Sequence, residues 1–405
     1  MRTQKNRIEA NTISTSAQEM IPLSVPEIQG NEWKYIKECL DTGWVSSVGA
    51  FVGKFEQSLA EYVGRKYAVA CVNGTAALHL AVVIAGIQPD EEVLVPALTF
   101  IAPANAVRYV GAWPVFIDVQ KDIWQMDPQK VKDFLTKECR YVNGRLINRH
   151  TKRAVRAIIP VHILGHPVDM DPIIELAKKF NLIIIEDVAE SIGARYKGRK
   201  TGQLGHLACF SFNGNKVITS GGGGMLVTDN ARWAERAHYL STQAKDDDLY
   251  YIHNEIGFNY RLSNIQAALG VAQMENLDKY IASKRLIAYR YDKELGLLSG
   301  LSLPREAKWA ESIFWLYTVL LDSKKLGLSQ QALIDKFRDS GIQVRPLWYP
   351  LHRLKPFQEC WAYKIEQADK IHKKALSLPS SIGLTQQRQD RVIEFVKELF
   401  ATGKN

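Results

Sequence analysis

The sequence predicts an α/β fold built on one large, mostly parallel β-sheet. Seven short apolar runs typical of buried strands alternate with stretches of helical periodicity between residues 67 and 228. This alternation indicates parallel strands joined by right-handed helical crossovers. The 405 residues suffice for two domains that share one large core, and the helices and strands after residue 277 predict a smaller α+β domain.

The composition is that of an ordinary globular protein, with 46% hydrophobic and 23% charged residues. No apolar run approaches the roughly 20 residues of a membrane span, so we expect no membrane partner. The first 20 residues are polar and lack the apolar core of a signal peptide, which predicts a mobile N-terminal arm. Five cysteines are scattered without CxxC spacing, as expected for reduced thiols in a cytoplasmic protein.

The net charge of +9 arises from 52 basic and 43 acidic residues. The basic residues are spread through amphipathic helices and form no patch, which disfavours a nucleic-acid partner. An anionic small-molecule substrate, by contrast, needs only a few local cations.

The first elements after the arm are an extended segment at 21–26 and two helices, expected over 31–40 and 51–63. The loop between these helices, GWVSSVG, contains Trp44. Two interpretations of this tryptophan stay open, because its ring serves both purposes. It either plugs the packing between elements or forms a wall of a substrate site.

The first strand of the sheet is expected over 67–72, and the sequence NGTAALHLA turns directly from it into a helix. Gly74 permits a close approach of the backbone at this turn. Thr75 and Ala76 begin a helix whose free N–H groups can bind an anion.

Phe100 follows the second strand, expected over 92–96, and its simplest interpretation is a core aromatic. Asn143 and Gly144 mark the tight turn of a polar hairpin. The elements around them are a helix at 105–110, a strand at 113–119, and a helix preceding the hairpin within 128–157.

A strand over 157–161 ends in His162, and His166 follows four residues later. The HxxxH spacing invites comparison with a metal site. However, this pair straddles Gly165 at a strand end and has no third ligand nearby in the sequence. A structural turn is therefore the preferred interpretation, and no metal site is predicted.

The next two strands carry the residues that point most directly to chemistry. Glu186 and Asp187 stand where the strand at 182–185 ends, and ligands bind at the carboxyl ends of strands in open α/β sheets. The following strand contains Ser211, and Lys216 comes five residues later. An acid and a lysine so placed can serve one pyridine cofactor. The acid keeps the ring nitrogen protonated, and the lysine forms a Schiff base with the aldehyde.

The rest of the chain completes the predicted sheet and supplies a second domain. The segment DDDLYYIHNEIGFNYRLSN is expected to be an irregular loop rich in tyrosine. The predicted domains are the arm at 1–20, a large domain at 21–276 and a small C-terminal domain at 277–405. The remaining elements are strands at 208–212, 225–228 and 314–321 and helices at 231–240, 263–276, 277–298, 330–340 and 386–400.

Several of these segments resemble one enzyme family. EDVAESIGARYKGRKTGQLG, SFNGNK and the glycine run at 221–224 are similar to the active-site segment of the fold-type I pyridoxal phosphate enzymes. Among these enzymes, they look most like the sugar aminotransferases of the DegT/DnrJ/EryC1/StrS family. NGTAALHLA, VPALTFIAPANAV, DVQKDIWQMDP, PVHILGHPVDMDP and GFNYRLSNIQAALG fit in the same order. The resemblance covers the chain from Ile21 onward and implies pyridoxal 5'-phosphate as the cofactor.

The resemblance also implies roles for individual residues. Lys216 and Asp187 would be the catalytic residues, Lys216 bonding the cofactor and moving protons and Asp187 pairing with the pyridine nitrogen. Phe100 would stack on the ring, and Glu190 would lie near the phenolic oxygen or the substrate. The cofactor phosphate would be held by Gly74, Thr75, Ala76 and Ser211, and by Asn259 reaching across from the partner subunit of a homodimer.

The implied reaction transfers an amino group from L-glutamate to C4 of a nucleotide-linked 4-keto-6-deoxy-N-acetylhexosamine. UDP is the expected nucleotide, and the product would serve a bacterial surface glycan such as O-antigen. Gly222 departs from the pattern, because many family members carry glutamate at this position. With the segment at 21–49, it resembles the branch that makes legionaminic acid and bacillosamine-type sugars.

Two alternative functions belong to the same scaffold. Sugar dehydratases of this fold have histidine in place of the lysine, so Lys216 speaks against that class. A regulatory protein that lost the cofactor would not be expected to keep Lys216, Asp187, Ser211 and Thr75 together.

Overall fold

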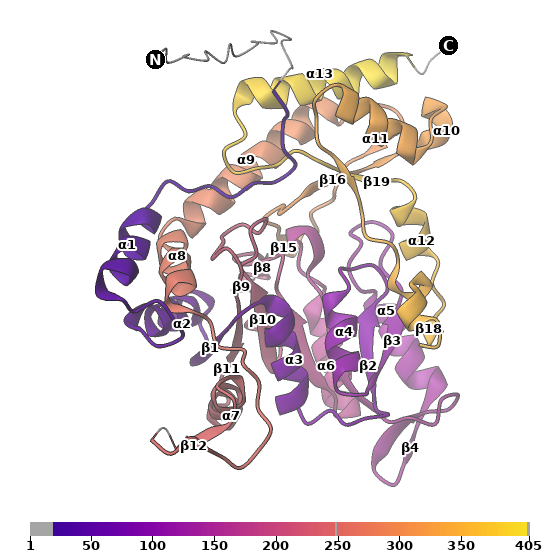
Figure 1. The fold of residues 1–405 in the computed structure, drawn as a ribbon. Helices are drawn as coiled ribbons and strands as arrows, with labels where there is room; N and C mark the ends of the chain where they lie inside the picture. The colour runs from indigo at the N-terminus through magenta and orange to yellow at the C-terminus, as the bar shows by residue number, and fades with distance from the viewer. Residues whose placement is uncertain (1–18, 248, 403–405) are drawn as a thin grey trace, which may run out of the picture.

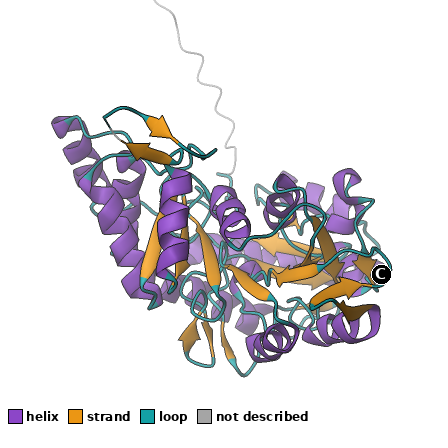
Figure 2. Ribbon diagram, turned by 90° about the horizontal axis from the view of Figure 1, so that it is seen from below, coloured by secondary structure: helices purple, strands orange, loops and turns teal. Residues whose placement is uncertain are grey.

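The computed structural model of the chain describes residues 19–247 and 249–402 and is built around one eight-stranded sheet (Figure 1). Helices cover both faces of this sheet, and a four-stranded sheet with its own helices lies at one end of it (Figures 1 and 2). The arm predicted at residues 1–20 lies almost entirely outside the described residues.

The large sheet confirms the predicted α/β class. Its strand order is β1-β11-β10-β7-β6-β2-β3-β18, and all neighbours from β10 to β18 are parallel. The bounds are β1 Tyr67–Cys71, β2 Glu92–Pro96, β3 Trp113–Ile117, β6 Val155–Ile158, β7 Ile183–Asp187, β10 Leu207–Ser211, β11 Gly224–Thr228 and β18 Ala362–Tyr363.

Two strands of this sheet differ from the sequence analysis. β11 is antiparallel to both of its neighbours, β1 and β10. No helix lies between β10 and β11, and without a crossover the chain returns in the opposite direction. β18 is an eighth strand that the C-terminal part adds beside β3. Its two residues are too few to show any periodicity.

Alternate residues of each strand pack on opposite faces of the sheet. In β2, Val93 and Val95 share a hydrophobic cluster with α3 and α4, whereas Leu94 packs with α5 and α6. At the β1 end, the second face is covered by α2 and α8. The strands are therefore buried on both faces, which explains their continuous apolar runs. These helices are α2 Ala50–Val63, α3 Gly74–Ile84, α4 Ala102–Tyr109, α5 Pro128–Asp133, α6 Met170–Phe180 and α8 Asn264–Met274.

The C-terminal part forms a separate antiparallel sheet in the order β14-β16-β19-β17. Three helices, α9, α11 and α13, bury their apolar faces against it in one cluster. The proposed domain boundary at 276 and 277 falls between α8 and α9. The bounds are α9 Leu277–Leu295, α10 Ser323–Leu326, α11 Gln330–Asp339, α12 Gln367–His372, α13 Gln386–Thr402, β14 Leu301–Ser302, β16 Tyr317–Leu321, β17 Arg345–Pro346 and β19 Ala375–Leu378.

Smaller elements decorate this frame. The polar hairpin predicted around Asn143 and Gly144 is confirmed, and both residues have positive φ (49° and 76°), as a tight hairpin turn requires. The tyrosine-rich loop contains a short hairpin rather than wholly irregular chain. These elements are α1 Glu32–Thr42, α7 Ala231–Ser241, β4 Cys139–Val142, β5 Arg145–Asn148, β8 Arg195–Tyr196, β9 Arg199–Lys200, β12 Lys245–Asp247, β13 Ile252–His253, β15 Ala310–Glu311, a π-helix at Phe134–Glu138 and 3-10 helices at Ile163–Gly165, Leu351–Arg353 and Lys355–Phe357.

Over the described ranges, no helix combines the length and the apolar character that crossing a bilayer requires.

Asp118 ties the C-terminal part of the chain to the edge of the large sheet. It follows β3 and is fully buried. Its carboxylate accepts hydrogen bonds from the backbone N–H groups of Glu366 at 2.7 Å, Gln367 at 2.8 Å and Ala368 at 2.9 Å. A fourth N–H, from Val119, donates to it at 2.9 Å. One carboxylate therefore fixes the start of α12 against β3.

Asp118→Asn should lower the free energy of unfolding by about 2–4 kcal/mol, because an amide leaves part of this buried donor set unpaired. Urea unfolding of both proteins measures the difference. The matched control is Asp122→Asn, whose side chain is 65% exposed and lies 3.7 Å from Arg305. The control should change stability by less than about 0.5 kcal/mol. Equal effects of the two substitutions would contradict the anchoring role.

Candidate active site

A cavity of about 630 Å³ opens where the carboxyl ends of the parallel strands face the four-stranded sheet. Part of its wall comes from Leu23 and Ser24 and from β17 and β19, including Arg345 and Ser377. Seven of the nine residues predicted to form the site line this one cavity, namely Gly74, Thr75, Phe100, Asp187, Glu190, Ser211 and Lys216.

Three residues singled out from the sequence lie elsewhere. Ala76 sits in the first turn of α3 but does not line the cavity, and its N–H donates to the Asn73 side chain at 2.8 Å. Asn259 is exposed and forms a β-bridge with Thr242. Trp44 is 57% exposed and contributes nothing to this cavity within its own chain.

The N-terminus of α3 forms one end of the cavity. Asn73 caps the helix, and the N–H groups of Gly74 and Thr75 have no acceptor within it. A Cβ added to Gly74 would stand 2.8 Å from the Cβ of Ser211, so only glycine lets the helix lie this close to β10. The Ser211 hydroxyl makes no hydrogen bond in the described part of the chain. Together with the positive end of the helix dipole, these groups fit a phosphate.

Asp187 is the last residue of β7, and its side chain is almost fully buried at the cavity wall. Its Oδ1 accepts the N–H of Ala189 at 3.0 Å. Burial raises the pKa of this carboxyl, while the Ala189 bond and the charge of Lys216 act in the opposite direction. A protonated ring nitrogen would supply the partner that a buried carboxylate requires.

Lys216 and Glu190 form a buried pair beside Asp187. The Lys216 Nζ lies 3.7 Å from the Glu190 Oε1, and the two side chains are 13% and 4% exposed. Burial lowers the pKa of Lys216, opposed by the charges of Glu190 and Asp187. Burial likewise raises the pKa of Glu190 to about 7. The charge of Lys216 acts in the opposite direction, as does the backbone N–H of Leu164, which donates to the Glu190 carboxylate at 2.8 Å. Both groups therefore titrate closer to neutrality than they do in water.

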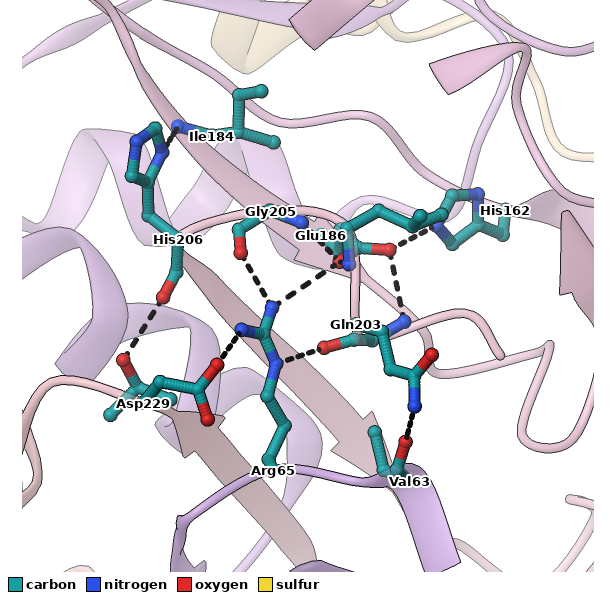
Figure 3. Close-up of polar contacts among 12 residues, drawn as sticks. Val63, Arg65, His162, Ile184, Glu186, Gln203, Gly205, His206 and Asp229 are labelled. Atoms are coloured by element: carbon teal, nitrogen blue, oxygen red, sulfur yellow. Dashed lines mark hydrogen bonds and ion pairs between the residues drawn. The ribbon is translucent and has the colours of Figure 1, made fainter. Parts of the chain in front are cut away.

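Glu186 precedes Asp187 but points to the opposite face of β7, where it joins a closed polar network (Figure 3). It accepts hydrogen bonds from His162 Nε2 at 3.0 Å and from the N–H groups of Gly202, Leu204 and Gly205 at 2.6–2.9 Å. The Arg65 guanidinium lies 4.0 Å from the Glu186 carboxylate and donates hydrogen bonds to the backbone carbonyl oxygens of Gly202 and Gly205. Burial would raise the pKa of Glu186, but these donors hold it below its ordinary value. Glu186 therefore braces β7 rather than lining the cavity.

The HxxxH pair is engaged in hydrogen bonds, as expected for a structural turn. The Nε2 of His162 forms a hydrogen bond with the Glu186 carboxylate, and its Nδ1 accepts a hydrogen bond from the Val168 N–H at 2.9 Å. His166 Nδ1 contacts the Pro167 carbonyl oxygen at 2.7 Å, and its Nε2 accepts the Ala307 N–H at 3.1 Å. Among the described residues, no group of three or more His, Cys, Asp or Glu side chains is placed to bind a metal ion.

The cavity contains residues that sequence reasoning missed, and it separates the two interpretations of Phe100. Thr99 is 1% exposed, and its Oγ1 lacks any hydrogen-bond partner in the described part of the chain. Thr99 is one of the residues that line the cavity. Phe100 is 54% exposed at the cavity wall, so the simple interpretation as a core aromatic is wrong. Trp315 also lines the cavity. Thr99 follows the strand expected over 92–96, and Trp315 lies in the strand expected over 314–321. Both stand beside apolar residues, and nothing in the sequence separates them from core residues.

Comparisons with known proteins identify a family over nearly the whole chain. The model of the DegT/DnrJ/EryC1/StrS aminotransferase family matches residues 26–397. A GDP-perosamine synthase from Caulobacter vibrioides is 40% identical over 374 residues, which are 92% of this chain and 96% of that protein. A GDP-perosamine synthase from Escherichia coli O157:H7 is 36% identical, with 94% and 99% of the two chains covered.

Solved structures share the fold over nearly the full length. DesV from S. venezuelae superposes with a TM-score of 0.81 at 30% identity, covering 93% of this chain and 95% of that one. A DegT DnrJ EryC1 StrS aminotransferase from Brucella abortus gives a TM-score of 0.83 at 27% identity, with 91% and 95% covered.

Proposed function

The chain belongs to the DegT/DnrJ/EryC1/StrS aminotransferase family, and we propose that it aminates C4 of a nucleotide-linked 4-keto-6-deoxy sugar with L-glutamate as the amino donor. As a member of this family it is a pyridoxal phosphate-dependent sugar aminotransferase of fold type I, acting in nucleotide-linked amino sugar biosynthesis. The observation that carries the proposal is the convergence of Lys216, Glu190 and Asp187 in one cavity beside the N-terminus of α3.

The residues present fit the cofactor at each end of the cavity. The first turn of α3 and the Ser211 hydroxyl would hold the phosphate, and Asp187 would pair with the ring nitrogen. Phe100 and Thr99 line the same cavity, where Phe100 would stack on the cofactor ring and the unpaired Thr99 hydroxyl would supply one further hydrogen bond. When bound, pyridoxal phosphate supplies an electron sink for the carbon that gains or loses the amino group.

The chain itself supplies binding and proton transfer. The Lys216 amine is the one amine among the cavity-lining residues, so we assign it the transfer of protons at the reacting carbon. Glu190 faces this amine at 3.7 Å, where it would stabilise the ammonium form between transfers. Asp187 would keep the ring nitrogen protonated, because a buried carboxylate favours the positive charge beside it.

The nucleotide of the substrate is proposed from the relatives. Two relatives with 36–40% identity are named GDP-perosamine synthase, and their names support GDP as the nucleotide of this substrate too. The UDP-linked N-acetylhexosamine expected from the sequence is the second candidate. It is favoured by Gly222, which lines the cavity at the position where many family members carry glutamate. Either product would serve a bacterial surface glycan.

A substrate panel tests this function. The purified protein is incubated with L-glutamate and with GDP-, UDP- or dTDP-linked 4-keto-6-deoxy sugars, and the amino-sugar products are identified by mass spectrometry. We expect the highest kcat/KM for the GDP sugar and no measurable product from Lys216→Ala, which lacks the required amine. Absence of amination with every sugar, or normal turnover by the Lys216→Ala protein, would contradict the proposal.

We also propose a homodimer whose two sites are each completed by the partner. Asn259 is exposed and lies outside the cavity of its own chain. The neighbouring hairpin and the segment that follows it expose large apolar side chains, with Leu249, Tyr250 and Ile256 exposed by 75%, 73% and 91%. Such apolar surface favours a protein partner, and an isologous contact would carry Asn259 to the other phosphate site.

A mixing experiment tests the shared sites. Chains carrying Lys216→Ala and chains carrying Asn259→Ala are each impaired alone, and are then mixed under conditions of verified subunit exchange. A mixed dimer would hold one site with both lesions and one with neither, so activity should rise above that of either parent. Unchanged activity after exchange would show that each site is built within one chain.

A further inference from the structure

Trp315 lies directly against the amine of Lys216. The centroid of its ring is 4.0 Å from the Lys216 Nζ, within the range in which an aromatic face attracts a cation. The Glu190 carboxylate lies 3.7 Å from the same nitrogen. Trp315 is 3% exposed and lines the cavity. The amine is thus held between an aromatic face and a carboxylate in a site largely shielded from water.

Contacts from three parts of the chain hold Trp315, one on its ring and two on its backbone. The indole Nε1 donates to the Asn215 carbonyl oxygen at 2.8 Å, one residue before Lys216. The backbone oxygen of Trp315 accepts a hydrogen bond from the Lys284 Nζ at 2.7 Å. Gly165, at φ 91°, packs so closely that a Cβ there would stand 2.8 Å from the backbone nitrogen of Trp315. A wall residue needed only to fill space would not require such specific anchoring.

Lys284 is unusual among these contacts. It is 2% exposed, and its amine bonds the carbonyl oxygens of Trp315 and Ser380, its only hydrogen-bond partners among the described residues. No acidic partner lies beside it in the described part of the chain. Burial lowers its pKa to about 7. A buried amine is tolerated when its hydrogen bonds are made, and here these bonds join α9 to the segment that carries the ring.

We propose that Trp315 is a positioning residue for Lys216. Its ring, together with Glu190, holds the Lys216 ammonium whenever the amine is not bonded to the cofactor, and Lys284 keeps the ring in place. This inference rests on the proposed function, in which Lys216 is the amine that is repeatedly bonded and released. It adds to that function a contact that biases the protonation of the amine between transfers.

The test must separate the ring face from the other groups that act on this amine. Glu190 and Asp187 also favour its charged form, and a smaller side chain at 315 would admit water. Fluorinated tryptophans avoid both effects, because fluorine weakens the negative potential of the ring face with little change in size. Mono-, di- and trifluorinated tryptophan are placed at position 315 of the full-length chain, and the same series at Trp348 serves as the control. Trp348 lines the same cavity, and no described contact joins it to Lys216.

The readout is the pKa of the Lys216 amine in the chain freed of cofactor, measured by pH-dependent labelling and mass spectrometry. We expect this pKa to fall stepwise with each fluorine at 315, by about 0.5 to 1 unit over the series, and to stay constant in the Trp348 series. A flat series at 315, or equal shifts at both positions, overturns the inference. The substrate panel with Lys216→Ala tests the proposed function separately, so the two failures are distinguishable.

The anchoring by Lys284 has its own readout. The fluorine resonance of monofluorotryptophan at 315 should be single and sharp, and should broaden or split in the Lys284→Met chain. An unaltered resonance in that chain would show that Lys284 does not hold the ring.

Discussion

The structure depends on one buried cation held next to buried acids. Lys216 lies 3.7 Å from Glu190 and is influenced by the charge of Asp187. In a site of low dielectric, each charge is tolerated only because the others are present. The parallel sheet makes this possible, since the ends of neighbouring strands place side chains from distant segments at one edge. The loop after β10 places Lys216 at the same edge of the sheet.

Two adjacent acids on β7 face opposite sides of the sheet and have different surroundings. Asp187 faces the cavity, and Glu186 faces the network of His162, Arg65 and the loop at 202–205. The period of two along a strand separates them. Replacing Glu186 would leave several buried donors unpaired, so the strand that presents Asp187 is held by the residue beside it. The supporting role of Glu186 and the catalytic role proposed for Asp187 thus fall on adjacent residues.

Much of this could be predicted from the sequence because its signals are local. Apolar runs located the buried strands. Four residues predicted to form the site line one cavity, namely Gly74, Asp187, Ser211 and Lys216. What failed depends on contacts that are distant in sequence. The direction of β11 and the addition of β18 depend on which strands pair in the folded sheet. Thr99 and Trp315 can be recognised only because the fold places them at the cavity. Asn259 lies outside the cavity of its own chain. In the proposed homodimer it would contact the phosphate site of the other chain.

The central claim is that Lys216 is the amine that bonds the cofactor. Borohydride reduction of the holoenzyme, followed by proteolysis and mass spectrometry, fixes the cofactor on the lysine that holds it. The account predicts one pyridoxyl modification, on the Nζ of Lys216, and none in a Lys216→Arg chain. Modification of a different lysine, or unchanged labelling of the Lys216→Arg chain, would contradict the assignment of the site.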